Sequence, residues 1–465
     1  MKFESMPRIV RSLIVLVIGS KQYFLRYGPA YRQFRGFLKS SERWSLAERE
    51  AWLTDSLKKL VTAAIDGTVY YKTLDLSGVQ AASGLRETLA AIPPLDKDTL
   101  RSRSPDFFNT AVSPVATSRT SGSTGSPMIV EYDRGSIQRR FALLAEHRAM
   151  AGIGPSDRGV RLSGRIICEP GKPHRRPWLH NPLEKQLLLS TYHLDARHFP
   201  AIRRKLEAFR PALIDGYPSA ILSLMRLYRA HGAPLPAGLK AIITTAETLD
   251  PGTREELEQL SGVGVFDYYS ASEGAPIIQQ CAFGTYHARW QSGIFEVEDD
   301  GVIAGEGDGA LVVTSFVQDR TLLIRYRTGD HVHSLKLASG ACGCGLVTPT
   351  VADVLGRAED LITTTDGRTL GMFSYRTLKY VDGLIEAQIV QNSVDGFLLR
   401  AVRDPRIAKE DLVQDARRNM ERVLGYPIQL EYEEVSVLLR GKNNKLRSTI
   451  SHVKPAGAGA PPPGC

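Results

Sequence analysis

Hydroxyl groups are concentrated in one stretch of the chain, 116–128, which reads ATSRTSGSTGSPM and is called here the hydroxyl-rich loop. Gly122 and Gly125 leave its backbone free to adopt positive φ and to approach a ligand closely. Hydroxyls and exposed N–H groups in a turn form a cradle for phosphate oxygens, although a flexible surface linker has a similar composition. The strand-like run MIVEY at 128–132 indicates that the loop is held between ordered elements. The loop is therefore a candidate phosphate-binding site, and it is not a Walker A motif because no Gly-Lys-Ser/Thr follows.

Four further motifs follow the hydroxyl-rich loop. They are DYYSASE at 267–273, RYRTGD at 325–330, GRAEDLI at 356–362 and GKNNKLR at 441–447. In this order and with these separations, the set resembles the adenylate-forming superfamily of acyl-coenzyme A ligases, luciferases and adenylation domains. The text between the motifs is most similar to the phenylacetate-coenzyme A ligase branch, including relatives associated with capsular polysaccharide genes. The resemblance covers about residues 20–455.

The resemblance implies an enzyme that joins ATP and a carboxylic acid into an acyl-adenylate and then passes the acyl group to a thiol, coenzyme A. Two anions meet in such a reaction, so the site must neutralise charge and hold an in-line geometry. Transfer to an amine or a carbohydrate hydroxyl is an alternative. A catalytically inactive scaffold is another, because Ser126 stands where the superfamily often has lysine and Ser270 where glycine is usual. The candidate acyl pocket lies around 217–219 and 275–276.

The same resemblance assigns nucleotide-binding roles to individual residues. The triphosphate would be held by Thr120, Ser121, Gly122, Ser123, Thr124 and Gly125, with Thr124 also catalytic. Residues implied at the adenine pocket are Glu247, Asp267, Tyr268, Tyr269 and Ser270, with the Tyr269 ring stacking on the base. Asp330 would accept hydrogen bonds from the ribose hydroxyls, since charge-assisted bonds are the stronger kind. Arg357, with Glu359 and Asp360, would form the hinge on which the small domain turns.

The resemblance also implies which residues take part directly in the reaction. Glu273 is implied as a catalytic ligand of Mg²⁺, a hard ion that prefers oxygen. The last motif contains the catalytic lysine of the superfamily, and both Lys442 and Lys445 are candidates. Lys445 is preferred because Lys445-Leu446-Arg447 fits the family's lysine-apolar-basic ending better. Without the resemblance, 440–447 would be a basic solvated loop.

A second set of residues has the composition of a metal site: Cys281, His287, Cys342 and Cys344. Three thiolates and an imidazole suit a closed tetrahedral structural Zn²⁺ site, and members of this branch carry similar sets. His331 or His333 could replace His287 as the fourth ligand. Buried reduced cysteines are the alternative, because free cysteine is among the most buried residue types.

Composition narrows the cellular setting. The chain has five cysteines in 465 residues, an odd and sparse set that argues against a secreted disulfide framework and favours the cytoplasm. Most of the net charge of +9 lies in 1–40, which has eight Lys or Arg and one Glu. Between these charges, 12–19 is apolar but too short to span a bilayer. This segment is expected to pack on the catalytic body or to rest on an anionic membrane surface. Nothing indicates a nucleic-acid partner, because the charge is not interleaved with aromatic residues.

The elements that must position these residues follow from apolar spacing and breaker residues. Ser45 and Glu48 form a capping box that opens a helix to about residue 65. Further on, helices alternate with short apolar strands, which predicts an α/β body whose strands are buried on both faces. These strands are expected at 212–215, 239–243 and 263–269.

The sequence predicts two domains. A large α/β domain with parallel or mixed sheets occupies 1–355, and a small mobile α+β domain occupies 356–453. The end of the large domain is rich in β-structure, with strands expected at 294–298, 309–316 and 322–326. The Pro- and Gly-rich tail at 454–465 cannot build a core and is expected to be disordered.

Overall fold

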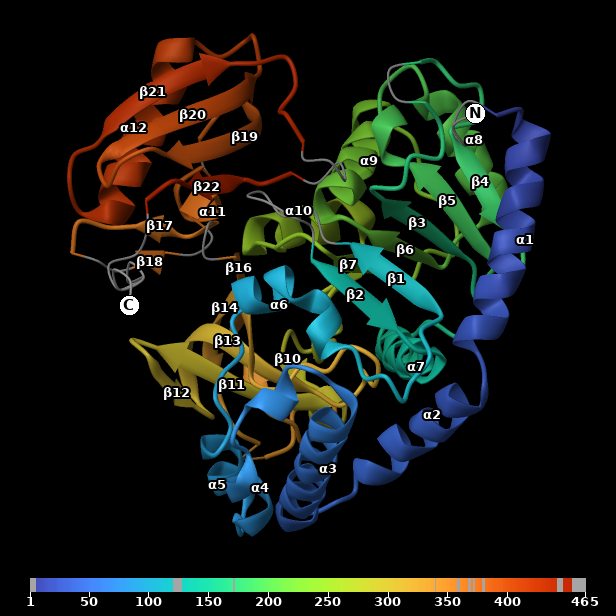
Figure 1. Ribbon diagram of the computed structural model, residues 1–465. Coiled ribbons are helices and arrows are strands. Elements are labelled where there is room, and N and C mark those ends of the chain that lie inside the picture. Colours follow the sequence, from blue (N-terminus) through green and yellow to red (C-terminus); the bar gives the residue numbers. More distant parts are fainter. Residues whose placement is uncertain are drawn as a thin grey trace.

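A computed structural model describes most of the chain (Figure 1). The described residues are 6–119, 128–169, 172–338, 340–357, 360–366, 369–370, 373–378, 381–440 and 446–453. The tail that was expected to be disordered lies outside them.

Helices dominate the first hundred residues. The long ones are α1 (Arg8–Arg26), α2 (Pro29–Ser41) and α3 (Leu46–Gly67). The predicted capping box of α3 is confirmed, because the Ser45 side chain accepts from the Glu48 N–H and the Glu48 carboxylate accepts from the Ser45 N–H. Short helices follow: α4 (Ser77–Ala81), α5 (Leu85–Ala90) and α6 (Lys97–Ser102).

A nine-stranded sheet forms the centre of the large domain, in the order β15-β10-β9-β8-β7-β6-β3-β5-β4. Its parallel strands are β3 (Gly159–Ser163), β5 (Gln186–Ser190), β6 (Leu213–Gly216), β7 (Ala241–Thr245) and β8 (Gly264–Tyr269). The strands predicted near 212–215, 239–243 and 263–269 are therefore confirmed as β6, β7 and β8. Antiparallel strands complete the two ends: β4 (Trp178–Asn181), β9 (Ile278–Gln280), β10 (Tyr286–Ala288) and β15 (Thr350–Val351).

Both faces of this sheet are covered, which explains why its strands are apolar runs rather than alternating patterns. One face packs against α8 (Phe199–Phe209), α9 (Pro218–Ala230) and α10 (Pro251–Ser261) in a single hydrophobic cluster. The other face packs against α2 and α7 (Arg134–Met150). The predicted α/β architecture is therefore present.

A second, five-stranded antiparallel sheet follows in the order β12-β11-β13-β14-β16. Its strands are β11 (Gly293–Asp299), β12 (Val302–Ala304), β13 (Gly307–Ser315), β14 (Tyr326–Leu335) and β16 (Asp353–Arg357). The strand predicted at 322–326 is wrong, because β14 begins only at Tyr326. Leu323 and Ile324 are fully buried, so their apolar character reflects the core rather than a strand. Arg325 turns the chain with a φ of 44° and places its guanidinium 3.0 Å from Glu296.

The C-terminal part of the described chain forms a separate core. Its four-stranded sheet contains β19 (Leu384–Gln391), β20 (Gly396–Arg403), β21 (Gln429–Glu434) and β22 (Thr449–Ser451). Helices α11 (Phe373–Leu378) and α12 (Lys409–Leu424) pack on it, and β17 (Ile362–Thr363) pairs with β18 (Thr369–Leu370). In Figure 1 this small α+β domain lies beside α10. The predicted domain boundary at 356 falls within β16, the last strand of the large domain's second sheet.

Helix α1 runs along the edge of the large domain, beside β4 and α7 (Figure 1). It therefore packs on the catalytic body, as one of the two expectations for this segment proposed. Among the described residues, no helix combines the length and the apolar character that crossing a bilayer requires.

Candidate active site

The parallel strands β3, β6, β7 and β8 all end at one edge of the nine-stranded sheet. In open α/β sheets, ligands bind in the crevice outside such carboxyl ends. Tyr269 is the last residue of β8, Glu273 follows four residues later, and Glu247 follows β7 by two residues. The strands of the second sheet add Asp330 from β14 and Arg357 from β16. Sequence motifs far apart in the chain are thereby brought to one edge.

Tyr269 and Asp330 are in direct contact. The Tyr269 hydroxyl donates a hydrogen bond of 2.7 Å to Oδ2 of Asp330. Burial raises the pKa of Asp330, while the same hydrogen bond, Lys97 and Arg357 act in the opposite direction. Arg357 is the backbone partner of Asp330 in the β14–β16 register. The implied ribose ligand and the implied hinge residue are therefore neighbours across two strands.

Lys97 is a site residue that the sequence reasoning missed. It begins α6, and its ammonium donates 2.6 Å to the Thr328 carbonyl oxygen and lies 3.8 Å from Oε1 of Glu273. Its spacing from the other motifs carries no signal, because α6 reaches this edge only through tertiary packing. Glu273 is 7% exposed and its Oε2 accepts 3.2 Å from the Ser272 hydroxyl. The carboxylate therefore lies in a nearly buried site beside a cation.

The three aromatic and acidic residues at the end of β8 do not share one environment. Side chains alternate along a strand. Tyr269 packs against the core beneath the second sheet, whereas Tyr268 packs on the α7 side, with its ring 5.3 Å from that of His147. Asp267 is buried, and its two oxygens accept from Thr244 at 2.7 Å and from Tyr286 at 3.1 Å. Only Tyr269 of this trio thus contacts Asp330, and Ser270 follows it, half-buried, directly after the strand.

Glu247 joins the two domains. Its Oε2 accepts from the Ser219 N–H at 3.2 Å, and its Oε1 accepts from the Leu446 N–H at 3.0 Å. Burial raises the pKa of this carboxyl group, and the hydrogen bonds it accepts lower it. Arg440 reaches the same place, donating 3.0 Å to the Ser219 hydroxyl and 2.7 Å to Glu386. The described flanks of the last motif are therefore both anchored at the carboxyl edge.

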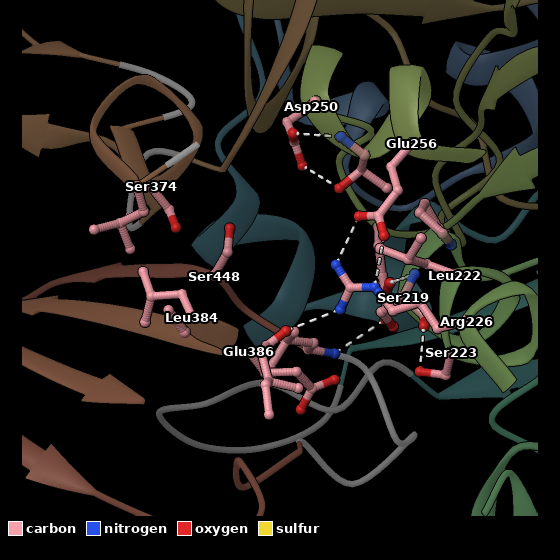
Figure 2. A pocket seen from close by; sticks show the side chains of 18 of the residues that line it. Ser219, Leu222, Ser223, Arg226, Asp250, Glu256, Ser374, Leu384, Glu386 and Ser448 are labelled. Atoms are coloured by element: carbon pink, nitrogen blue, oxygen red, sulfur yellow. Dashed lines mark hydrogen bonds and ion pairs between the residues drawn. The ribbon is translucent and has the colours of Figure 1, made fainter. Parts of the chain in front are cut away.

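A cleft of about 420 Å³ lies between the two domains at this contact. In Figure 2, Arg226 and Glu256 form its large-domain side, joined at 2.7 Å, and Leu384 and Ser448 lie across from them on the small domain. A further pair, Arg447 with Asp360 at 2.6 Å, ties the last motif to the hinge motif. The domain arrangement is thus held by polar contacts around an open cleft.

The residues suggested for the acyl pocket flank these positions. Tyr217 is buried beside Glu247 at the start of α9, and Ala275 is fully buried, with its carbonyl accepting 3.1 Å from Arg140. Asp215, at the end of β6, accepts from Arg148 at 2.8 Å and from Arg161 at 3.3 Å. The sequence reasoning did not find this charged group, since its members come from β3, β6 and α7.

Several predicted residues lie outside the described part of the chain. They are Thr120, Ser121, Gly122, Ser123, Thr124, Gly125, Ser126, Glu359, Lys442 and Lys445. The strands on either side of the hydroxyl-rich loop are described: β1 (Ala116–Arg119) pairs antiparallel with β2 (Ile129–Tyr132). The strand expected after the loop is therefore confirmed.

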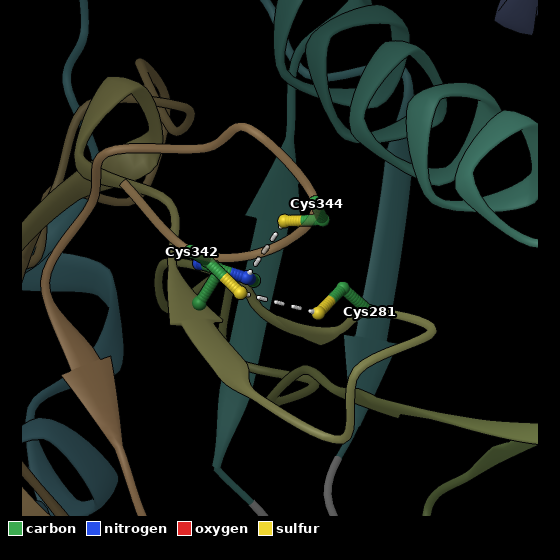
Figure 3. Close-up of side chains that lie close together, drawn as sticks. Cys281, Cys342 and Cys344 are labelled. Carbon is green, nitrogen blue, oxygen red and sulfur yellow. Dashed lines mark hydrogen bonds between the residues drawn. The ribbon is translucent and has the colours of Figure 1, made fainter. Parts of the chain in front are cut away.

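The predicted metal ligands do converge. The ligand atoms of Cys281, His287, Cys342 and Cys344 all lie within 4.8 Å of one another (Figure 3). Cys281 Sγ is 3.8 Å from Cys342 Sγ, and Cys344 Sγ is 3.3 Å from His287 Nε2. Cys281 follows β9 in a tight turn, and the Cys342–Gly345 turn approaches it from the loop between β14 and β15. No disulfide joins these three cysteines.

The arrangement fits a tetrahedral ion. Sulfurs bound at about 2.3 Å to a tetrahedral centre lie about 3.8 Å apart, which matches the spacing of Cys281 and Cys342. Nδ1 of His287 is 2.8 Å from the Thr348 hydroxyl, which leaves Nε2 facing the thiols. Burial lowers the pKa of His287 to about 4, so its ring is neutral, as ligation requires. His333 pairs instead with Asp308 at 2.9 Å, and His331 is likewise not part of the cluster. Of the histidines weighed as fourth ligand, the structure brings His287 to the cysteines.

Comparisons with known proteins agree with this architecture. Protein CapK of Staphylococcus aureus is 25% identical over 378 residues, covering 80% of this chain and 83% of that protein. Phenylacetate-coenzyme A ligase of Thermus thermophilus is 27% identical over 326 residues, covering 66% and 70%. A solved structure of 2-hydroxyisobutyryl-CoA ligase in the postadenylation state superposes with a TM-score of 0.67 at 19% identity, covering 87% of this chain and 90% of that one. No family model matches the chain.

The fold, with a large and a small domain that meet at a cleft, is similar to that of the solved 2-hydroxyisobutyryl-CoA ligase. Two of the relatives by sequence and this structural neighbour are named as coenzyme A ligases. The chain is similar, over about two thirds or more of its length, to protein CapK and to two phenylacetate-coenzyme A ligases.

Proposed function

We propose that the protein activates a carboxylic acid with ATP to an acyl-adenylate and then transfers the acyl group to coenzyme A. The observation that carries this proposal is the meeting of Tyr269, Asp330, Lys97 and Glu273 at one carboxyl edge. A carboxylate, a phenol, an ammonium group and a second carboxylate within reach of one another form a site for a polyanionic nucleotide and its counter-ion.

Each of these residues has a role that its surroundings support. The Asp330 carboxylate accepts hydrogen bonds from the ribose hydroxyls, and the Tyr269 ring packs on adenine. Glu273 is the Mg²⁺ ligand, since Lys97 at 3.8 Å is beyond hydrogen-bond distance of Oε1 and leaves that oxygen available. Bound Mg²⁺ supplies neutralisation of phosphate charge. Lys97 adds a second positive charge at the same place, where pyrophosphate has to leave.

The hydroxyl-rich loop and the last motif complete the proposed reaction. Thr120, Ser121, Ser123 and Thr124 take the triphosphate, and Lys445 rather than Lys442 bridges the substrate carboxylate and the α-phosphate. Support comes from Leu446, the residue after Lys445, whose N–H reaches Glu247 at the carboxyl edge.

The domain arrangement corresponds to the first half-reaction in this proposal. The chain superposes with a TM-score of 0.67 on 2-hydroxyisobutyryl-CoA ligase in the postadenylation state and of 0.54 on the same ligase in the thioesterification state. Rotation about Arg357 and Asp360 would then break the Glu247–Leu446 and Asp360–Arg447 contacts. The small domain would thereby present another face to the adenylate for attack by coenzyme A.

Cys281, His287, Cys342 and Cys344 bind a structural Zn²⁺ in this proposal. All four ligand positions of a tetrahedral ion are filled by protein atoms, so the ion would have no open position for chemistry. Its role is to hold the loop between β14 and β15 against the β9–β10 hairpin, which follows Glu273 in the chain.

The test is acid-dependent exchange of labelled pyrophosphate into ATP, across a panel of aryl, short-chain and fatty acids, followed by assay for a coenzyme A thioester. Exchange with one acid class and thioester formation is the expected result. Exchange that is followed by transfer only to an amine or a carbohydrate hydroxyl would move the proposal to that acceptor. Failure to bind ATP at all would contradict it in favour of a scaffold.

A further inference from the structure

The outward face of α1 is largely apolar and includes one lysine. At 3.6 residues per turn, positions 10, 13, 17, 21 and 24 lie on one side of a helix. Four of these are Val10, Leu13, Val17 and Phe24, which are 40, 57, 69 and 69% exposed. In Figure 1 this helix lies at the margin of the large domain, with one side turned away from it. A stripe of large apolar side chains on a surface helix indicates a binding face, whereas single exposed ones do not.

The inward face of α1 is mixed, because Val15 packs against Ile167, Cys168 and Leu179 while polar groups lie beside it. Arg11 is only 6% exposed, and it donates 2.6 Å to the Ile167 carbonyl oxygen. Arg26 forms an ion pair with Glu184 at the other end of the helix. Gly19 packs against β4, where an added Cβ would come within 2.9 Å of the Asn181 side chain. An ordinary surface helix has its apolar stripe toward the core, whereas α1 has a second apolar stripe that faces outward and is unpartnered in the described part of the chain.

The charged residues of the segment that contains the stripe are all basic. The segment 6–41 contains seven Lys or Arg residues and no Asp or Glu. Lys21 lies within the stripe, and Arg32 and Lys39 are exposed on the next helix, α2. Arg26 and Arg35 are already paired with acidic residues of the large domain. The surface next to the apolar stripe therefore attracts anions.

We propose that α1 binds the surface of an anionic lipid membrane, lying in the plane of the interface with Val10, Leu13, Val17 and Phe24 among the acyl chains and Lys21 at the headgroups. Such interfacial helices combine an apolar face with basic residues. A second copy of the chain is a poorer occupant, because two such basic surfaces repel each other. One helical stripe is also narrow beside the roughly 800 Å² that each partner of a stable protein interface buries.

The experiment uses the full-length protein and lipid vesicles of phosphatidylcholine, with and without about one third phosphatidylglycerol. Flotation with the anionic vesicles is the expected result, with much weaker flotation on the neutral ones. Val17→Asp is expected to weaken binding at least about tenfold, because it puts a charge among the acyl chains. Lys21→Gln is expected to weaken binding to anionic vesicles about fivefold and to leave neutral vesicles unaffected.

Val302→Asp is the matched control, because Val302 is also 69% exposed but lies on β12. It should float like the wild type. The secondary-structure content and ATP–pyrophosphate exchange of Val17→Asp should equal those of the wild type, since the stripe is not part of the catalytic site. Absence of wild-type flotation, or equal flotation of Val17→Asp, would overturn the membrane assignment. A wild-type dimer that Val17→Asp converts to a monomer would assign the stripe to a second copy instead.

Discussion

The Tyr269 hydroxyl lies 2.7 Å from Oδ2 of Asp330, so the last residue of β8 is bonded to the middle of β14. This contact joins the carboxyl edge of the parallel sheet to the second sheet. On the other side of Asp330, the paired strand β16 carries Arg357, in the hinge motif. A nucleotide that engages Asp330 would therefore act one strand away from the residue about which the small domain is proposed to turn.

Removing the Asp330 carboxylate should weaken ATP binding strongly. Hydrogen bonds to charged groups contribute about 1.5–3 kcal/mol, so Asp330→Ala should raise the KM for ATP by about ten- to a hundredfold in pyrophosphate exchange. Tyr269→Phe keeps the ring and loses only the hydroxyl, and its effect should stay below about fivefold. Equal losses in the two variants would mean that Tyr269 acts through its hydroxyl rather than by stacking.

Lys97 should contribute to nucleotide affinity although no motif contains it. Lys97→Met removes the cation beside Glu273 and keeps the length of the side chain. It is expected to raise the KM for ATP several-fold and to raise the Mg²⁺ concentration needed for half-maximal exchange. Lys59→Met is the control, because Lys59 forms an exposed helix pair with Asp55 at 2.7 Å. If the Lys97 variant behaves like the Lys59 variant, Lys97 has no part in binding ATP or Mg²⁺.

Glu247 should matter for one half-reaction only. Its two oxygens hold Ser219 and Leu446 together, so Glu247→Ala would release the last motif from the carboxyl edge. Pyrophosphate exchange should fall at least about tenfold, since the loss leaves two N–H groups unpaired. Thioester formation from a supplied acyl-adenylate should be nearly unchanged. Glu255→Ala, in the same cleft, serves as the control. A higher KM for ATP with unchanged kcat would instead assign Glu247 to the adenine pocket.

Local sequence patterns predicted much of the secondary structure. The capping box at Ser45 and the alternating strands and helices of the large sheet followed from short-range patterns. The strand expected at 322–326 failed because a buried apolar run is not specific to strands, and the turn at Arg325 depends on its pairing with Glu296. Lys97 and the Arg148–Asp215 pair could not be predicted as site residues from the sequence, for a similar reason. Their partners are distant in sequence, and only the packing of α6 and α7 brings them to the sheet edge.

The Cys/His cluster should contain one Zn²⁺ per chain in protein purified without chelator, measured by elemental analysis. The double variant Cys342→Ser and Cys344→Ser should lose the metal and unfold at lower denaturant concentration, because metal-binding free energy contributes to folding. Cys168→Ala is the control, since Cys168 is buried away from the cluster. Metal-free wild-type protein, together with an unchanged unfolding midpoint in the double variant, would reduce the four residues to a packed thiol cluster.

His147 should make the large domain sensitive to acid. Its ring is fully buried against Tyr268, with Nε2 3.0 Å from the Gln280 carbonyl oxygen, and burial lowers its pKa from 6.5 to about 4. Between those two values the unfolded chain binds a proton that the folded chain does not, so stability is complete above pH 6.5 and falls as the pH drops toward 4. The loss of folding free energy expected at pH 5 is about 2 kcal/mol, from the linkage relation.

In urea unfolding at pH 7.5 and pH 5, His147→Gln should show a smaller loss of stability than the wild type by that amount. His452→Gln, at an exposed position, should keep the wild-type difference. A wild-type slope retained in His147→Gln would assign the acid sensitivity to other buried groups.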